Sequence, residues 1–155
     1  MLIKYLTVLL WSMVPIVELR GAIPIGTIGL DLPMWSTYLV AVLGNLIPVP
    51  FIILFIRPIF EFINNRIPPL KKFVDYCMEK ANRNVEKVKR YEMLGLFLFV
   101  AIPLPGTGAW TGALVAAFMD MRIKDAFPSI AAGVVAAGLI MIALSAGGIN
   151  IMQSI

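Results

Sequence analysis

Histidine is absent from this sequence, and cysteine occurs once, as Cys77. Zinc sites rely largely on cysteine and histidine, and Ser-His and Cys-His nucleophilic pairs need a histidine. These absences exclude such sites, so we expect a chain that is not an enzyme and that holds no metal and no cofactor. A lone cysteine also forms no intramolecular disulfide, which agrees with a cytoplasmic position for Cys77.

Charged residues are scarce as well. They make up 14% of the 155 residues, while apolar residues make up 60%; an ordinary soluble domain is about 25% charged. Uncharged runs cover residues 32–56, 93–119 and 126–155, and each is longer than the roughly 20 residues that a spanning helix needs. A buried core helix of a soluble protein would explain one such run but not three. The sequence therefore predicts an all-α integral membrane protein, folded as a compact helical bundle.

The net charge of +4 comes from one segment. Nine of the thirteen basic residues lie between positions 57 and 90, beside five acidic residues between positions 61 and 92. The positive-inside rule places this segment in the cytoplasm, so we expect no nucleic-acid partner. Apolar residues recur at helical spacing from 70 to 91, which predicts a basic amphipathic helix on the membrane face or against the bundle. A solvated helix face is the alternative.

The start of the chain resembles a signal peptide, because Lys4 precedes an apolar stretch. However, Pro15, Glu18 and Arg20 stand where a small-residue cleavage site would be. We therefore expect residues 1–17 to be retained.

Three regions follow from these patterns: a first membrane half (1–56), a basic amphipathic link (57–92) and a second membrane half (93–155). Residues 22–27 (Ala-Ile-Pro-Ile-Gly-Thr) have a counterpart in residues 101–107 (Ala-Ile-Pro-Leu-Pro-Gly-Thr). Paired apolar segments that glycine and proline interrupt in corresponding halves indicate a transporter's binding site.

Each half contains one interrupted segment and one longer segment. The pieces 93–102 and 109–119, like 5–14 and 21–30, are about half the length needed to cross a bilayer. The interrupting residues are Pro15, Glu18, Arg20 and Pro24 in the first half and Pro103, Pro105, Gly106 and Gly108 in the second. Each interruption predicts a re-entrant hairpin or a broken helix, and a single kinked spanning helix is the alternative.

The longer segments, 34–56 and 126–147, are predicted to span the membrane. Trp35 and Tyr38 are suitable interface anchors for the first span, and Pro48 and Pro50 should kink it. The second span is rich in small residues such as Gly133, which allow helices to approach closely.

Glu18 and Arg20 are ionisable residues in an otherwise apolar region. Such residues mark a binding site or a proton path by default. Glu18 can bind and release a proton, and the planar guanidinium of Arg20 can grip a phosphate or carboxylate. The alternative is that both lie at the membrane interface and only orient a loop.

The second interruption offers uncharged polar groups. Glycines such as Gly106 and Gly108 expose backbone amides, and a half-helix that begins near Ala109 would direct its positive end at the break. Thr107 and Thr111 add hydroxyl groups, and Trp110 adds an indole N–H. Together with Arg20 and the neighbouring Gly21, these groups predict a site for an anionic group on an apolar molecule. A close Gly108–Gly112 helix contact is the alternative.

The segments Glu18–Pro24 (Glu-Leu-Arg-Gly-Ala-Ile-Pro) and 102–112 (Ile-Pro-Leu-Pro-Gly-Thr-Gly-Ala-Trp-Thr-Gly) resemble the prokaryotic membrane family labelled "small multi-drug export protein". The arrangement as a whole resembles the broader DedA (SNARE-associated, VTT) superfamily. That resemblance implies two re-entrant hairpins that meet tip to tip, and proton-linked transport or flipping of lipids such as polyprenyl phosphates.

The resemblance also implies roles for particular residues. The family's glutamate carries over to Glu18 and its proline-rich turn to Pro24, and the second turn carries over to Pro103 and Pro105. DedA proteins have arginines around the second proline, whereas Val100, Ala101 and Thr107 stand here. This departure leaves Arg20 as the arginine for an anion.

We therefore expect a transporter or flippase for an amphiphilic, anionic, lipid-like substrate such as a polyprenyl phosphate, coupled to protons through Glu18. One alternative is an exporter of drugs or cations, with Glu18 as the cation site. Another is a structural or assembly membrane protein. The expected location is the prokaryotic plasma membrane (the cell inner membrane), with several membrane passes. Membrane lipids and the amphiphilic substrate are the expected partners, and a homo-oligomer is left open.

Overall fold

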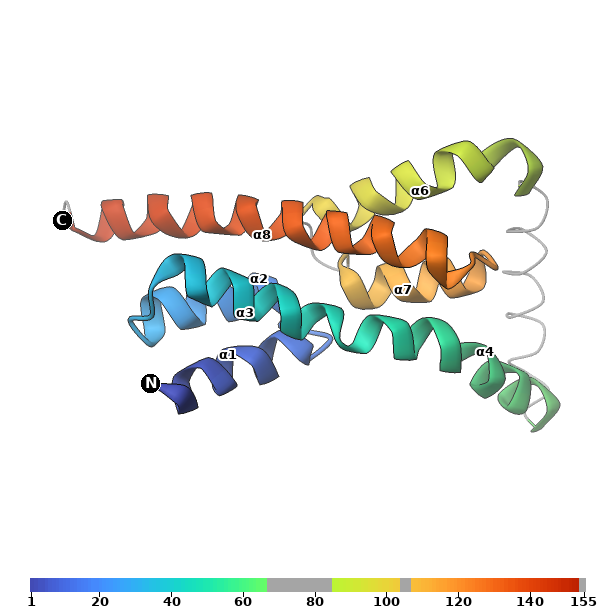
Figure 1. Cartoon of the computed structure of the whole chain (residues 1–155), viewed down its shortest axis with the longest axis horizontal. Coiled ribbons are helices and arrows are strands. Elements are labelled where there is room, and N and C mark those ends of the chain that lie inside the picture. The colour runs from blue at the N-terminus through green and yellow to red at the C-terminus, as the bar shows by residue number, and fades with distance from the viewer. Residues whose placement is uncertain (67–84, 104–106, 154–155) are drawn as a thin grey trace.

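The computed structural model describes residues 1–66, 85–103 and 107–153. Within these ranges all regular structure is helical, as the sequence predicts (Figure 1). The elements are α1 (Leu2–Met13), α2 (Glu18–Pro24), the π-helical turn η1 (Ile25–Gly29), α3 (Met34–Leu46), α4 (Pro48–Arg66), α6 (Val85–Ala101), α7 (Ala109–Phe118) and α8 (Ile123–Gln153).

Two long antiparallel rods run the length of the molecule (Figure 1). One is α3 followed by α4, and the other is α8. Their segments Met34–Ile56 and Ile123–Gly147 are long and apolar enough to cross a membrane. The helix is interrupted where the kink was predicted, because α3 ends at Leu46 and α4 begins at Pro48. Proline has no N–H for the helical ladder, yet Ile47 keeps helical dihedrals, so the rod continues past the break.

The outer faces of these rods are apolar. Leu43 is 61% exposed and Phe51 58% exposed, and Leu144 near the end of α8 is 59% exposed. Apolar faces of this extent are unfavourable in water and favourable in lipid. The protein is therefore a helical membrane protein.

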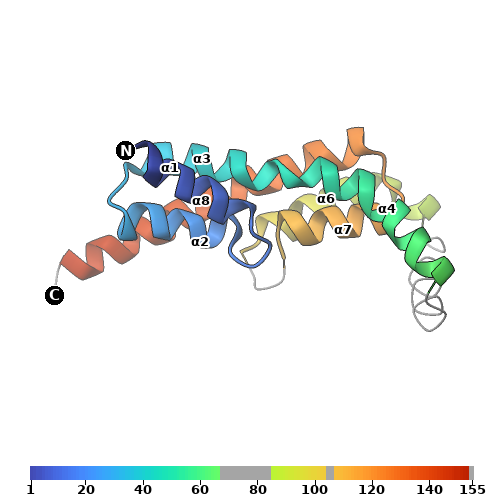
Figure 2. The ribbon, with the colours of Figure 1, turned by 90° about the horizontal axis from the view of Figure 1, so that it is seen from below.

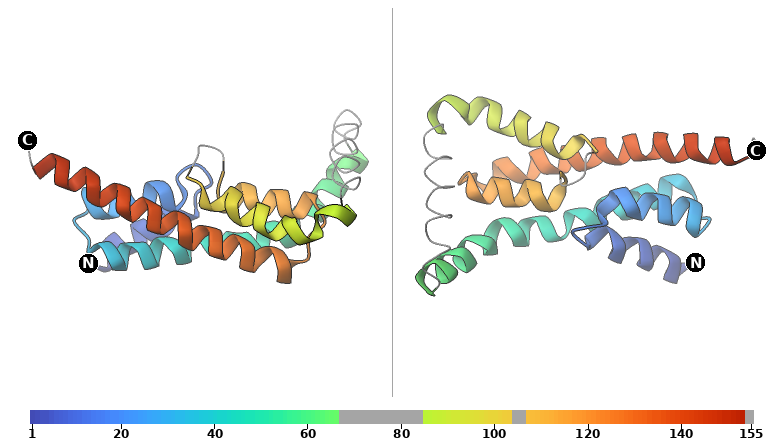
Figure 3. Two further views of the ribbon diagram at one scale, coloured as in Figure 1. Left: turned by 90° about the horizontal axis from the view of Figure 1, so that it is seen from above. Right: turned by 180° about the vertical axis from the view of Figure 1, so that it is seen from behind.

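The two interruptions are reversals of chain direction. Residues 14–17 turn the chain from α1 into α2, and the segment between α6 and α7 does the same in the second half (Figures 1 and 3). Each hairpin occupies one end of the bundle, and the start of α7 lies near the first turn, at the middle of the bundle (Figure 2). The structure thus has hairpins at both places where a kinked spanning helix was the alternative. Residues 104–106, which include Pro105 and Gly106, lie outside the described residues.

The expectation that Pro24 forms the turn of the first hairpin is wrong. Pro24 lies inside the helix, with φ −59° and ψ −41°, where α2 passes into η1. Proline tolerates these dihedrals, because its ring fixes φ near −65°. The hydroxyl of Thr27 donates to the carbonyl of Ile23 at 2.8 Å. Pro15 is instead the proline of the turn.

The sequence match between 22–27 and 101–107 does not join equivalent positions either. The first stretch is helical, whereas in the second only Ala101 is helical and the other described residues, Ile102, Pro103 and Thr107, are not. The two halves instead share one order of elements, in which a pair of helices is followed by a long helical rod. A left-handed aspartate follows each hairpin, Asp31 at φ 52° and Asp120 at φ 58°, and a long helix begins three residues later at Met34 or Ile123.

The predicted link is described at its two ends. Residues 57–66 continue α4, and residues 85–92 form the first part of α6. Most of the predicted amphipathic helix 70–91 lies outside the described residues.

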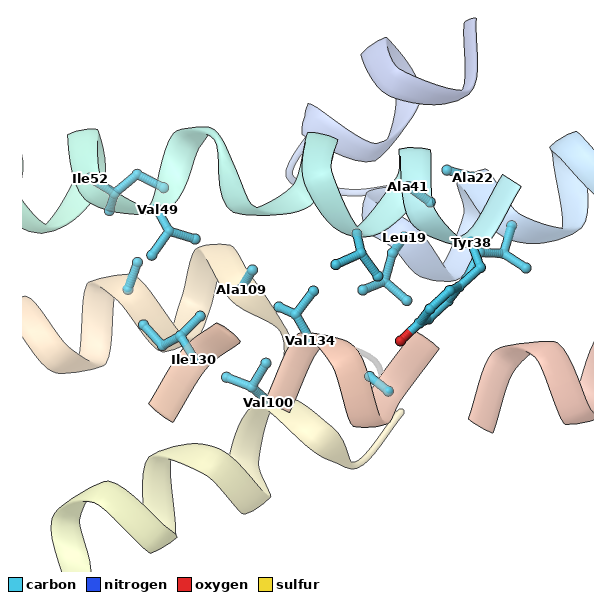
Figure 4. Packing of buried hydrophobic residues seen from close by; sticks show 14 of the residues in the cluster. Leu19, Ala22, Tyr38, Ala41, Val49, Ile52, Val100, Ala109, Ile130 and Val134 are labelled. Carbon is cyan, nitrogen blue, oxygen red and sulfur yellow. The ribbon is translucent and has the colours of Figure 1, made fainter. Parts of the chain in front are cut away.

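The core lies where the hairpins meet the rods (Figure 4). It is built from buried apolar residues of every helical layer, among them Leu19, Ala22, Ala41, Val49, Val100, Ala109, Ile130 and Val134. Small residues bring helices close, as the composition of α8 predicts. A Cβ added to Gly133 would lie 2.7 Å from Cβ of Val100 and 2.9 Å from the carbonyl oxygen of Phe97.

The Gly133 contact gives a stability prediction. Gly133→Ala should lower the melting temperature in detergent, since overpacking costs about 1–3 kcal/mol. The control is Gly147→Ala on the same helix, where an added Cβ meets nothing within 4 Å. This variant should be neutral or stabilising, because alanine favours the helix over glycine by about 0.5–1 kcal/mol. Equal shifts for the two variants would contradict the close α6–α8 contact at Gly133.

Candidate functional site

Glu18 stands at the point where the first turn becomes α2. Its amide donates to the carbonyl of Val14 at 2.9 Å, which closes the turn. Its backbone has φ 50°, a left-handed conformation that costs a non-glycine residue about 1–2 kcal/mol. The side chain is nevertheless buried, with 6% of the residue exposed. Such strain persists only where surrounding contacts fix it.

Those contacts come from the second hairpin. The amide of Trp110 donates to Oε1 of Glu18 at 3.3 Å, and the backbone of Ala109 is a further hydrogen-bond partner of the carboxylate. Both amides belong to the first turn of α7, whose N–H groups have no partner within the helix. The carboxylate therefore caps α7 from another hairpin, at the end where the helix dipole is positive.

Gly108 makes this approach sterically feasible. It is the N-cap of α7 and has φ 153°. A Cβ at this position would lie 2.0 Å from Oε2 of Glu18 and 2.6 Å from its Cδ. Any other residue would push the carboxylate off the helix end.

Arg20 binds the other end of the second interruption, where α6 ends. Its Nη2 donates to the carbonyl of Ile102 at 3.2 Å, to that of Val100 at 3.4 Å and to the hydroxyl of Thr107 at 3.0 Å. Since α6 ends at Ala101, these carbonyls belong to its C-terminus, the negative end of its dipole. The Thr107 hydroxyl also donates to Ile102 at 2.8 Å.

One short stretch of the first hairpin thus binds both helix ends at the second interruption. The carboxylate meets the start of α7, and the guanidinium meets the end of α6. Each charge is matched to the helix end of opposite sign. The negative charge of Glu18 and the positive charge of Arg20 also attract each other. We call this set of contacts the charge clasp, formed by Glu18 and Arg20 with residues 100–102 and 107–110.

Trp110 adds a contact that runs from the second hairpin to the first. Its indole Nε1 donates to the carbonyl of Met13 at 3.0 Å, at the C-terminal end of α1. The second hairpin therefore also caps a helix end of the first.

The structure brings together several of the predicted site residues and separates others. Glu18, Arg20, Thr107, Gly108 and Trp110 meet, although about ninety residues separate the two groups. The prediction that Glu18 or Arg20 lies close to the second interruption is confirmed.

The other predicted residues that the structure describes lie outside the charge clasp. Thr111 donates to the carbonyl of Gly108 at 3.4 Å, within the first turn of α7. Gly21 lies in α2, where an added Cβ would meet the side chain of Val17 at 2.5 Å. Pro24 lies further along α2, away from the turn, and Pro103 is in the described part of the second turn.

Sequence reasoning missed Asn45, a buried amide in the last turn of α3. Its signal was available, because it is the one amide side chain in the uncharged run 32–56 and stands three residues before Pro48.

Comparison with known proteins identifies the class. The family model described as "Putative small multi-drug export protein" matches residues 18–140, which include every described residue of the charge clasp. The chain belongs to this family. The searches of curated proteins and of solved structures found no match.

The charge clasp gives a prediction on coupling. Gly108→Ala should destabilise the protein strongly while Glu18 is present, and much less in a Glu18→Ala background, where the carboxylate that would clash is gone. The backbone strain that alanine meets at φ 153° is the same in both backgrounds, so it cancels from the coupling energy. A double-mutant cycle of unfolding free energies should give a coupling of about 1–3 kcal/mol.

The control cycle replaces Gly108 with Gly95, where an added Cβ meets nothing within 4 Å. Gly95→Ala and Glu18→Ala should be additive. Additivity of Gly108→Ala with Glu18→Ala would show that Glu18 does not lie against α7.

Proposed function

We propose that this protein is a proton-coupled exporter of amphiphilic molecules in the prokaryotic plasma membrane, and that Glu18 is its proton-binding residue. The observation that carries the proposal is the buried carboxylate of Glu18 on the first amides of α7. The family's description, which names multi-drug export, supports the direction and the broad substrate class.

The placement in the membrane follows from the two rods. If α3–α4 and α8 both cross the bilayer, the hairpins enter from opposite faces and their turns meet at mid-depth. The end of α4 at Arg66 and the start of α6 at Val85, both within the basic link, lie at the same end of the bundle as the turn before α8 (Figure 1). The positive-inside rule makes that end cytoplasmic.

The proposed proton coupling rests on the hydrogen bonds and the charge attraction that hold the charge clasp together. Hydrogen bonds to a charged group contribute about 1.5–3 kcal/mol, against about 0.5–1.5 kcal/mol for neutral pairs. Protonation of Glu18 would weaken its bonds to the amides of Ala109 and Trp110 and remove its attraction to Arg20. The contact between the first hairpin and the start of α7 would then weaken. A change of this size is enough to shift a balance between a closed and an open junction.

The contacts of the clasp favour a cationic amphiphile as the substrate. Arg20 directs its guanidinium at carbonyl groups of α6, and Glu18 occupies the positive end of α7. The carboxylate is then the charge that a proton and a cation can exchange. Its surroundings are apolar, which suits a molecule with a hydrophobic body.

An anionic, lipid-like substrate such as a polyprenyl phosphate is the second candidate. The amides of Ala109 and Trp110 would favour it, since they form an anion site whenever protonated Glu18 leaves them. Arg20 stands on the other side of the same break and would add positive charge.

Transport in proteoliposomes tests the proposal. With a pH gradient imposed, the wild type should export a cationic dye, and Glu18→Gln should reduce the rate by about tenfold or more, equivalent to about 1.4 kcal/mol. The matched control is Asp125→Asn, which removes an acidic charge from the exposed Arg122–Asp125 pair and should leave transport unchanged. Competition by polyprenyl phosphate but not by other cations would favour the second candidate.

Two results would contradict the proposal. One is full pH-driven transport by Glu18→Gln. The other is a wild-type protein that moves neither substrate class while Glu18→Gln loses its monodispersity in detergent, which would make the clasp a purely structural device.

A further inference from the structure

Asn45 is a buried polar residue that the described protein does not satisfy. It is 1% exposed, and among the described residues neither its Nδ2 nor its Oδ1 has a hydrogen-bond partner. Leaving such a group unpaired costs about 1–3 kcal/mol. Most buried polar side chains in native proteins are paired, so an unpaired one calls for a reason.

Asn45 lies on the core face of its rod. The buried residues Ala41 and Val49 stand one helical turn before and after it, on the same face. Ala41 and Val49 lie on the side of the rod that faces Leu19 and Ala109 (Figure 4). Leu19 directly follows Glu18, and Ala109 is a backbone partner of its carboxylate. The helix face formed by Ala41, Asn45 and Val49 therefore covers the place where the hairpins meet.

Other polar groups of these helices are satisfied. The hydroxyl of Tyr38, two turns before Asn45, donates to the carbonyl of Val135 at 3.2 Å. The buried hydroxyl of Ser12 donates to the carbonyl of Leu9 at 2.7 Å. An apolar residue of similar size would fill the position of Asn45 at lower cost. Asparagine at this point therefore calls for a hydrogen-bond partner that the described residues do not supply.

We propose that Asn45 binds the polar head of the exported molecule, and that it selects protonated amines over quaternary ammonium ions. This inference rests on the proposed function. The carboxylate of Glu18 supplies the charge, which both kinds of cation satisfy. The Oδ1 of Asn45 accepts an N–H, which a protonated amine carries and a quaternary ammonium ion lacks. Its Nδ2 donates to an acceptor on the same molecule.

The physical basis is the asymmetry of hydrogen-bonded sites. A site built to hydrogen-bond its ligand rejects an analogue that lacks the group, because the buried protein group is then left unpaired. An apolar site discriminates far less. The loss of the amide should therefore reduce selectivity, while the apolar part of binding is kept.

Binding to protein in nanodiscs tests the inference, with two probes of equal charge: protonated dimethyl(phenylbutyl)amine and its N-methylated analogue, trimethyl(phenylbutyl)ammonium. The wild type should bind the amine about tenfold more tightly. Asn45→Leu keeps the volume and removes the amide, so it should bind both probes equally, at the affinity of the quaternary ion. It should also raise the melting temperature of the ligand-free protein, because an unpaired amide is removed.

The matched control is Ser145→Ala. The Ser145 hydroxyl is likewise buried and unpartnered among the described residues, but it lies in the C-terminal part of α8. This variant should raise the melting temperature and leave the preference for the amine unchanged.

Three results would overturn the inference: equal binding of the two probes by the wild type, no binding of either, or a lower melting temperature of Asn45→Leu with its preference intact. The last would show a structural role. These outcomes are separate from the proposed function, since the effect of Glu18→Gln on dye export does not depend on Asn45.

Discussion

Backbone groups that a membrane-embedded break leaves unpaired must be satisfied inside the protein, and the rest of this structure depends on how that is done. A broken helix exposes amides at one end and carbonyls at the other, and lipid offers no partner for either. Glu18 bonds to amides at the start of α7, and Arg20 bonds to carbonyls at the end of α6. Two opposite charges, two positions apart in the chain, thus neutralise both ends of a break that lies about eighty to ninety residues away.

Other features of the centre follow from this interaction. Gly108 is required because the carboxylate lies where a Cβ would be. The left-handed backbone of Glu18 is tolerated because the contacts with α7 fix it. Trp110 returns the contact by bonding to the end of α1. The same carboxylate that joins the hairpins is the group a proton would neutralise, so structure and proposed coupling rest on one side chain.

The sequence predicted much of this arrangement, for identifiable physical reasons. Long uncharged runs determine the spans, and prolines in apolar runs determine the breaks, because the bilayer allows few alternatives. The meeting of Arg20 with the second interruption was predicted because its guanidinium and the polar groups of that interruption complement one another in a single site.

Local features were less predictable. Pro24 was assigned to a turn although a helix tolerates its dihedrals, and the match of 22–27 with 101–107 rested on common residue types. Asn45 was missed although it is the one amide side chain of the run 32–56, because its importance becomes evident only from its burial and its lack of a hydrogen-bond partner among the described residues.

Hydrogen exchange at the start of α7 tests the central claim most directly. In nanodiscs, Glu18→Ala should speed the exchange of the amides of residues 109–111, because the carboxylate that accepts from Trp110 is removed. Exchange in the buried middle of α8, around Ile130 and Val134, should stay as slow as in the wild type. Unchanged exchange at 109–111 in a folded Glu18→Ala protein would contradict the claim that this residue holds the two hairpins together.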